Sequence, residues 1–384
     1  MKKYAVVGGS VVLDIEPFIE NEDFEITQGK LIYVPDIQMH VGGTIGNTGL
    51  ALNRLGIPVF SMGMTGNDNR ASIIKIILEE EGVDYFFAAD QNERTSTSIV
   101  FAVPGKDRCI INSGGSNKSF SSDIIDVAKF PEDSAVFHFA YPTAMKNLYS
   151  NGGKGMYDIL KRVRDKGIAC SLDVCPPRET DLNWARILSC WLPLTDFFEP
   201  SIEEMLIMLD SDYYKKINNE RKGNNIIDLI TVEKVREIAN MLVALGGKII
   251  LLKVGKKGLY LKTAGEDAIK QIPRAIDNPQ KWANREVWFP PCAVPVVSTK
   301  GAGDTAIAGF LAGVLDGLNP EQALAIATLT AGCCIRTLDS ISGIPSLENL
   351  KAEMLSGFAQ ESVSLSKDWK WNKQYALGPC DITR

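Results

Sequence analysis

The stretch VVSTKGAGDTAIAGFLAG, residues 296–313, places three small residues and a single acid before an apolar, helix-like run. In one interpretation Asp304 only caps the helix, by accepting hydrogen bonds from its first N–H groups. In the other, Gly301, Ala302 and Gly303 leave the N–H groups of a helix N-terminus uncovered, which makes an anion site. Asp304 would then accept a proton from a hydroxyl group that attacks phosphorus. The local sequence favours the cap, so the rest of the chain has to decide.

Composition excludes several classes of protein. The chain has 384 residues, 45% of them hydrophobic and 23% charged, which suits one large α/β domain with an appended piece. No run of apolar residues is long enough to span a membrane. The net charge of −6 is spread over interspersed acids and bases, so we expect no nucleic-acid partner and favour small molecules.

Cysteine and histidine usage narrows the chemistry. The 8 cysteines contain no CxxC pair, so neither a disulfide framework nor a zinc site is indicated, and we expect a cytoplasmic protein. Only 2 histidines occur, His40 and His138. His138 lies inside the apolar segment AVFHFA, where a structural role is more common than a catalytic one.

Short apolar runs alternate with helical patterns along most of the chain, which predicts βα units on a mainly parallel sheet. Helices are expected at residues 145–166 and 232–245. The expected strands are YAVVGG, PVFSMG, AVFHFA, GIACSLDV, TDFFEP, KIILLKVG and CAVPVV.

Two segments interrupt this order. Residues 26–41 and 95–112 alternate like antiparallel strands, the second around a Pro-Gly turn, and together they predict one small projecting sheet. The polar stretches at 210–228 and 264–290 are expected to be irregular surface insertions.

The common nucleotide motifs are absent: there is no GxxxxGK[ST], and the first strand lacks GxGxxG. A second glycine segment remains, VGGTIGNTGLALNRLG at residues 41–56. Gly42 and Gly43 would let a ligand approach the backbone, and Asn47 offers both a donor and an acceptor.

The two glycine segments, in this order, resemble those of the PfkB or ribokinase-like carbohydrate kinases. Residues 63–84, the segment LLKVGKKGLY at 251–260 and the lid-like strands agree more weakly, and the resemblance covers residues 3–355. It implies a doubly wound, mainly parallel α/β sheet with helices on both faces and a small β-sheet lid. The implied kinase domain is 1–360, with lid strands inserted at about 15–40 and 95–113, followed by a tail at 361–384.

The resemblance also implies transfer of the ATP γ-phosphoryl group to a hydroxyl of a sugar or sugar-like molecule, with Mg²⁺. A homodimer through the lid is one arrangement that it suggests. Asp304 matches the general base, and Gly301, Ala302 and Gly303 match the anion hole. The acceptor positions are Asp14, Gly42, Gly43 and Asn47; the nucleotide positions are Lys253, Gly255, Gly258, Thr299 and Lys300; and Glu204 matches a magnesium residue acting through water.

The chain departs from the family pattern at three places. Ser298 and Thr299 stand where Asp-Thr is usual, SIEE at 201–204 lacks the asparagine, and DVCPPR at 173–178 keeps only Asp173. We expect the ammonium of Lys300 to supply the charge that a monovalent cation supplies elsewhere in the family. A nucleoside kinase of the same fold, or a non-catalytic sugar- or nucleotide-binding relative, stays open.

Overall fold

The computed structural model describes residues 3–104, 108–363, 365, 369–371 and 382–383. The tip of the predicted Pro-Gly turn, at 105–107, and most of the predicted tail lie outside the described residues. Within the described part, no helix is long and apolar enough to cross a lipid bilayer.

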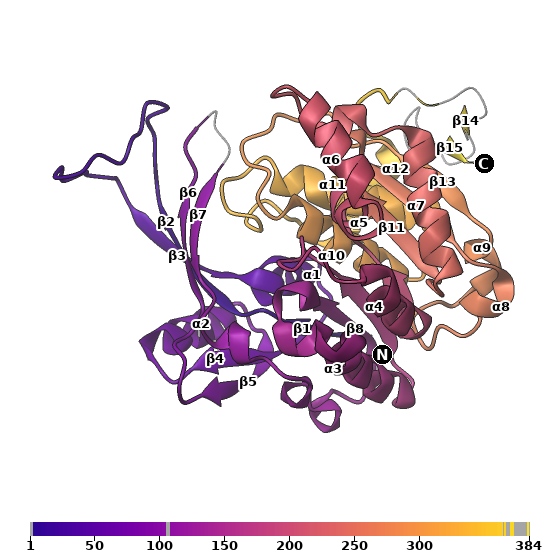
Figure 1. The fold of residues 1–384 in the computed structure, drawn as a ribbon, viewed down its shortest axis with the longest axis horizontal. Coiled ribbons are helices and arrows are strands. Elements are labelled where there is room, and N and C mark those ends of the chain that lie inside the picture. Colours follow the sequence, from indigo (N-terminus) through magenta and orange to yellow (C-terminus); the bar gives the residue numbers. More distant parts are fainter. Residues whose placement is uncertain (1–2, 105–107, 364, 366–368, 372–381, 384) are drawn as a thin grey trace.

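The main sheet has 11 strands among the described residues, in the order β14-β15-β13-β12-β11-β10-β9-β8-β1-β4-β5 (Figure 1). Seven neighbouring strands are parallel: β5 (Asp84–Asp90), β4 (Val59–Gly66), β1 (Tyr4–Gly9), β8 (Ser134–Ala140), β9 (Ala169–Asp173), β10 (Phe197–Phe198) and β11 (Ile249–Lys253). An antiparallel edge follows: β12 (Leu259–Thr263), β13 (Glu286–Phe289), β15 (Ile382–Thr383) and β14 (Lys370–Trp371). The mainly parallel sheet is therefore confirmed.

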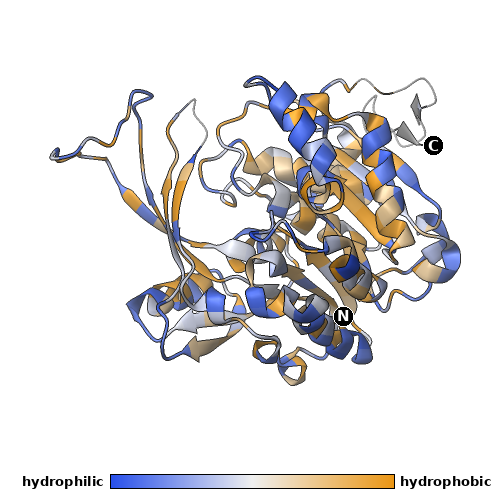
Figure 2. Cartoon of the chain, viewed as in Figure 1, coloured by the Kyte–Doolittle hydropathy of each residue, from blue (hydrophilic) through white to orange (hydrophobic). Residues whose placement is uncertain are grey.

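Alternate residues of the central strands face two separate cores. Ala5 and Val7 of β1 lie in one cluster and Val6 lies in the other, as the two-residue period of a strand requires. Figure 2 shows these strands as a hydrophobic layer beneath helices with polar outer surfaces. Such a sheet, buried on both faces, is doubly wound as expected.

Helices cover both faces of the main sheet. The first face carries α1 (Leu50–Arg54), α2 (Asn69–Glu80), α8 (Glu266–Ile269), α9 (Pro279–Trp282), α10 (Ala302–Leu315), α11 (Pro320–Cys334) and α12 (Leu347–Ser356). The second carries α3 (Lys146–Asp165), α4 (Trp184–Trp191), α5 (Ile202–Leu209), α6 (Ser211–Glu220) and α7 (Val232–Ala244). Helix α7 confirms the expectation at 232–245. Helix α3 confirms the one at 145–166 except at residues 150–153, where the backbone angles are not helical and the helix is broken.

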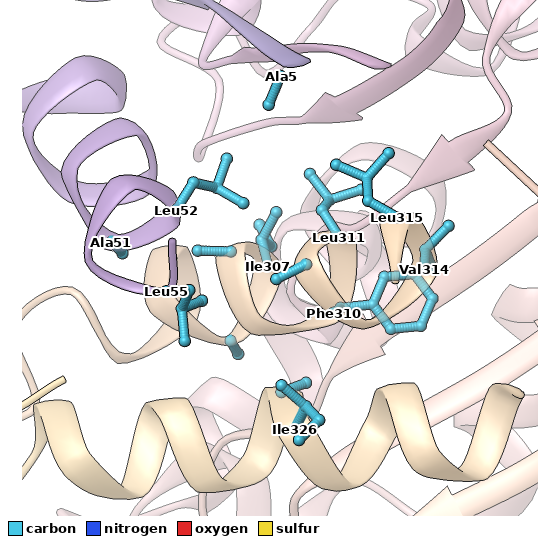
Figure 3. Close-up of a cluster of buried hydrophobic side chains, with 14 of the residues drawn as sticks. Ala5, Ala51, Leu52, Leu55, Ile307, Phe310, Leu311, Val314, Leu315 and Ile326 are labelled. Atoms are coloured by element: carbon cyan, nitrogen blue, oxygen red, sulfur yellow. The ribbon is translucent and has the colours of Figure 1, made fainter. Parts of the chain in front are cut away.

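Helix α10 is central to the first core. Ile307 and Leu311 face Leu52 of α1 and Leu55 at its C-terminal end, and Ile326 of α11 lies on the opposite side (Figure 3). Because all of its sides are packed, the position of its N-terminus is fixed by the core.

Four strands form a separate sheet, which we call the lid, in the order β3-β2-β6-β7. Their bounds are β2 (Val12–Pro17), β3 (Ile37–Gly42), β6 (Thr97–Phe101) and β7 (Cys109–Ser113). The lid extends from one side of the main sheet (Figure 1). The lid strands lie close to the predicted insertions at about 15–40 and 95–113, but the first of them, β2, begins earlier than predicted, directly after β1.

Two expectations were wrong. CAVPVV forms no strand, because its proline has no N–H to donate and Val296 and Val297 are 61% and 54% exposed. The stretch 264–290 is not an irregular insertion, because it contains the buried strand β13 and two short helices. The stretch at 210–228 likewise contains α6, whose Ile217 is buried in the second core.

Candidate active site

The turn before α10 is held by backbone geometry and not by a capping side chain. Gly301 precedes the helix with φ of 73°, in the left-handed region, and no side chain accepts a hydrogen bond at this cap. The Thr305 hydroxyl donates to the Gly301 carbonyl at 2.9 Å, so it does not cap the N–H groups either. Of the predicted anion-hole amides, that of Ala302 donates to the Thr299 carbonyl at 3.3 Å. The structure thus contradicts the interpretation of Asp304 as a cap.

Asp304 instead accepts hydrogen bonds from two distant segments. Asn47, in the π-helical turn Ile45–Gly49, donates from Nδ2 to Oδ2 at 2.9 Å, and the Tyr141 hydroxyl donates to Oδ1. Burial raises the pKa of Asp304, while Lys253, Tyr141 and Asn47 favour its charged form and limit that rise. The carboxylate is therefore oriented and poised above the usual aspartate range, as suits a proton acceptor.

Sequence reasoning missed Tyr141. This residue follows β8 with φ of 66° and ψ of 35°, a left-handed conformation that is costly for a residue with a bulky side chain. Its N–H donates to the Asp173 carbonyl at 3.1 Å, which fixes the backbone between two central strands. Its place at the carboxyl end of a buried parallel strand is the signal that could have found it.

Lys253 lies at the end of β11, beside the turn that precedes α10. Its Nζ is 2.8 Å from Oδ1 of Asp173, and a Cβ placed on Gly303 would lie 3.4 Å from its side chain. Burial alone would lower the pKa of Lys253, but the surrounding carboxylates, Asp173 first, raise it above its usual value. Burial raises the pKa of Asp173, against the effect of Lys253. Lys253 is thus a buried cation beside the predicted phosphate site.

Glu204 belongs to a capping box at the start of α5. Its Oε2 accepts from the Ser201 N–H at 2.7 Å, and Ser201 Oγ accepts from the Glu204 N–H at 3.2 Å. Serine in place of the family asparagine thus still caps the helix and fixes the carboxylate. Among the described residues, no group of three or more His, Cys, Asp and Glu side chains could hold a metal ion. The single carboxylate of Glu204 is nevertheless compatible with Mg²⁺, because this ion takes most of its ligands from phosphates and water.

The glycine pair permits a close approach to Asp14. A Cβ on Gly42 would lie 2.5 Å from Oδ2 of Asp14, and Gly43, with φ of 70°, would bring one to 2.6 Å from Ser10. Gly42 therefore packs directly beneath the Asp14 carboxylate, and the structure brings these predicted acceptor residues together.

Lys300 differs from the expectation. Its Nζ is 2.9 Å from Oε2 of Glu16 and 3.3 Å from Oδ2 of Asp14, both on the lid strand β2. The ammonium therefore pairs with Glu16 and with Asp14, a predicted acceptor residue, and this pairing does not support the expected role in place of a monovalent cation. A small cavity of about 120 Å³ adjoins Lys300 and Asn47.

The other predicted nucleotide positions surround the end of β11. Gly255 and Gly258 have φ of 51° and 91° in the turn that leads to β12, and a Cβ on Gly258 would lie 2.1 Å from the Phe289 carbonyl oxygen. Thr299 is exposed beside Lys300. Their roles toward a nucleotide stay predictions.

Comparison with known proteins agrees with this geometry. The model of the pfkB family carbohydrate kinases matches residues 2–347. The chain is 25% identical to an uncharacterized sugar kinase of Archaeoglobus fulgidus over 77% of this chain and 98% of that protein. It is 24% identical to the 2-dehydro-3-deoxygluconokinase of Bacillus subtilis over 88% of this chain and 93% of that protein.

A solved structure shows the same fold. The ribokinase of Arabidopsis thaliana, complexed with ribose and ATP, matches with a TM-score of 0.64 and 22% identity over 92% of this chain and 98% of that chain. Because the family model covers nearly the whole chain, this protein belongs to the pfkB family of carbohydrate kinases.

Proposed function

We propose that the protein transfers the γ-phosphoryl group of ATP to a hydroxyl group of a sugar or sugar-like molecule, with Asp304 as the general base. The observation that carries the proposal is the double support of one carboxylate at the start of α10. Asn47 and Tyr141 each donate to Asp304 from segments far away in the sequence. A helix cap needs no such support, whereas a catalytic base needs a fixed orientation.

In this mechanism the acceptor O–H gives its proton to Asp304 as its oxygen forms a bond to the γ-phosphorus. The bond from that phosphorus to the bridging oxygen breaks, and ADP leaves with the electron pair. The backbone N–H groups of Gly301 and Gly303 would stabilise the charge on the transferring oxygens, while that of Ala302 donates to the Thr299 carbonyl within the turn. Lys253, whose stem covers Gly303, adds a positive charge beside them.

The two cofactors are ATP and Mg²⁺. Mg²⁺ bound with ATP would neutralise phosphate charge, and Glu204 would hold it through water. Gly255, Gly258 and Thr299 would border the nucleotide. ATP as donor suits the cytoplasmic location expected from the sequence, which stays a prediction.

The acceptor would bind between the lid and the main sheet. The Asp14 carboxylate and the side-chain amide oxygen Oδ1 of Asn47 would accept hydrogen bonds from the hydroxyl groups of the acceptor. Gly42 and Gly43, which have no side chains, would let the acceptor approach the backbone. Closure of the lid would exclude water from the phosphoryl group and limit ATP hydrolysis.

We extend the proposal to a homodimer formed through the lid. Many large apolar side chains of the lid strands and of residues 18–36 are exposed, and such surface favours association. They are Ile26, Leu31, Ile32, Tyr33, Ile37, Met39, Ile99, Ile110 and Ile111. Sedimentation of the wild type and of an Ile111→Glu variant would show whether the lid joins two copies.

A nucleoside acceptor is the second candidate. Phe24 and Phe101 stack in the lid with ring centroids 6.3 Å apart, and aromatic surface of this kind can receive a base. A non-catalytic binding protein is disfavoured, because Asp304 and both of its donors are in place.

The test is ADP release with a panel of sugars, sugar acids, sugar phosphates and nucleosides. Asp304→Asn should lower kcat by at least about a hundredfold, with the KM for ATP little changed, because it removes the base and keeps the shape. Asp158→Asn, an exposed aspartate paired with Lys154 on α3, is the matched control. Equal turnover in Asp304→Asn and the wild type would refute the assigned role.

A further inference from the structure

One buried lysine joins the two halves of the site. The Lys300 ammonium is 2.9 Å from Oε2 of Glu16 and 3.3 Å from Oδ2 of Asp14. The side chains of the three residues are only 10%, 9% and 11% exposed. Glu16 lies 284 positions away from Lys300 in the sequence, so this contact is made by the fold and not by a local turn.

The geometry places the carboxylates on one face of the lid. Asp14 and Glu16 are two positions apart in β2, so their side chains leave the strand on the same side. Strand β2 pairs with β3 and β6 and also packs against helix α2. Lys300 approaches this face from the main domain.

The backbone of Lys300 is held by residues of the main domain, while its ammonium contacts the lid. Its carbonyl oxygen accepts from the Ser340 hydroxyl and the Cys334 thiol, both at 3.1 Å. The next residue, Gly301, begins the turn that is predicted to hold the phosphoryl oxygens. Lys300 therefore has its backbone next to the turn that is predicted to bind phosphate, and its ammonium contacts the lid.

Charge explains why the contact matters for binding. Two carboxylates on one side of a strand repel each other, and the repulsion is stronger where water is largely excluded. A single ammonium between them removes much of this cost and fixes the direction of the Asp14 carboxylate. Without it, Asp14 would turn away from Glu16 and would leave the position above Gly42.

We propose that Lys300 is a positioning residue that holds Asp14 ready for the acceptor and ties the lid to the phosphate-binding turn. This inference rests on the proposed function, because it assigns Asp14 to the acceptor. It predicts that loss of the ammonium weakens acceptor binding far more than ATP binding. A direct contact of Lys300 with the nucleotide predicts the reverse.

The first experiment compares Lys300→Met, Lys300→Arg and the control Lys161→Met. Lys161 forms an exposed ion pair with Asp165 on α3 and has no place in the site. Lys300→Met should raise the acceptor KM at least about tenfold, since a charge-assisted contact is lost, and should leave the KM for ATP within about twofold. Lys300→Arg keeps the charge and should recover part of the loss, whereas Lys161→Met should match the wild type. An unchanged acceptor KM in Lys300→Met would overturn the proposal.

The double variant Lys300→Met/Glu16→Gln tests the charge argument. Removing the Glu16 charge ends the repulsion against Asp14, so the acceptor KM should fall at least about threefold below that of Lys300→Met. A double variant as poor as Lys300→Met, or worse, would show that the ammonium does not act through the two carboxylates.

Hydrogen exchange makes the proposal testable without turnover. Amides of β2 should exchange at least about tenfold faster in Lys300→Met than in the wild type, with the amides of β5 as internal reference. Equal exchange in β2 would refute the tie between lid and turn even if no acceptor is found. A wild type that releases no ADP with any acceptor would refute the proposed function and leave this measurement to decide the tie.

Discussion

Removing one oxygen atom from Tyr141 should shift the pH dependence of the reaction. Tyr141→Phe keeps the ring and the left-handed backbone but deletes the hydroxyl that donates to Oδ1 of Asp304. A hydrogen bond to a charged group contributes about 1.5–3 kcal/mol. The loss of this contribution should raise the pKa of Asp304 further above the usual aspartate range.

The direction of the shift follows from the role of the carboxylate. The hydroxyl stabilises the charged form of Asp304, so its removal raises the pKa and protonates the base at a higher pH. The acid limb of the profile of kcat against pH should therefore move to higher pH in Tyr141→Phe than in the wild type. Initial rates of ADP release at saturating ATP and acceptor, measured across the acid range, would give this limb directly.

Tyr149→Phe is the matched control for this experiment. Tyr149 is a buried tyrosine whose hydroxyl also donates to a carboxylate, Glu179 at 3.2 Å, but it lies on α3 outside the site. Its profile should coincide with that of the wild type. If the acid limb of Tyr141→Phe also coincides with the wild type, Tyr141 does not tune Asp304 and the reasoning fails.

Three further outcomes are expected. Gly42→Ala should raise the acceptor KM without changing the KM for ATP, because its Cβ would lie 2.5 Å from the Asp14 carboxylate; Gly265→Ala, with no close neighbour, is the kinetic control. Gly301→Ala should lower stability to urea by about 1–2 kcal/mol, because φ of 73° is costly for any residue with a Cβ. Burial raises the pKa of Glu199 to about 8 from its usual 4.5, so the folded protein binds more protons and loses stability as pH rises between these values. Glu199→Gln should therefore show a smaller fall in unfolding free energy from about pH 5 to pH 8 in urea titrations.

The elements that the sequence predicts well are those whose burial is uniform. Strands β1, β8 and β11 are continuous apolar runs because both faces of a parallel sheet are covered. The segment at 292–297 has a similar composition but contains a proline and lies at the surface. An apolar segment becomes a strand only where a neighbouring strand is present to pair with it. Composition alone does not show whether such a neighbour exists.

The site residues also divide into those that the sequence could predict and those that it could not. Asp304 and Asn47 could be proposed because each lies in a short glycine-containing motif that resembles the family pattern, and Asp14 because it follows the first strand at a matching family position. Tyr141 carries no such motif, since its role depends on a left-handed backbone and on Asp304, which is 163 positions away. Glu16 was not singled out either, because its partner Lys300 comes from the other end of the chain.

Lys253 and Lys300 explain how this site can depart from the family pattern and still hold its acids in place. Lys253 pairs with Asp173 at 2.8 Å on the nucleotide side, and Lys300 is shared by Asp14 and Glu16 on the acceptor side. Each ammonium contacts carboxylates and is enclosed by protein, so neither charge is free to attract an anion without competition. Under the proposed function, phosphate binding would therefore depend on backbone N–H groups and on Mg²⁺ bound with ATP, more than on a free lysine.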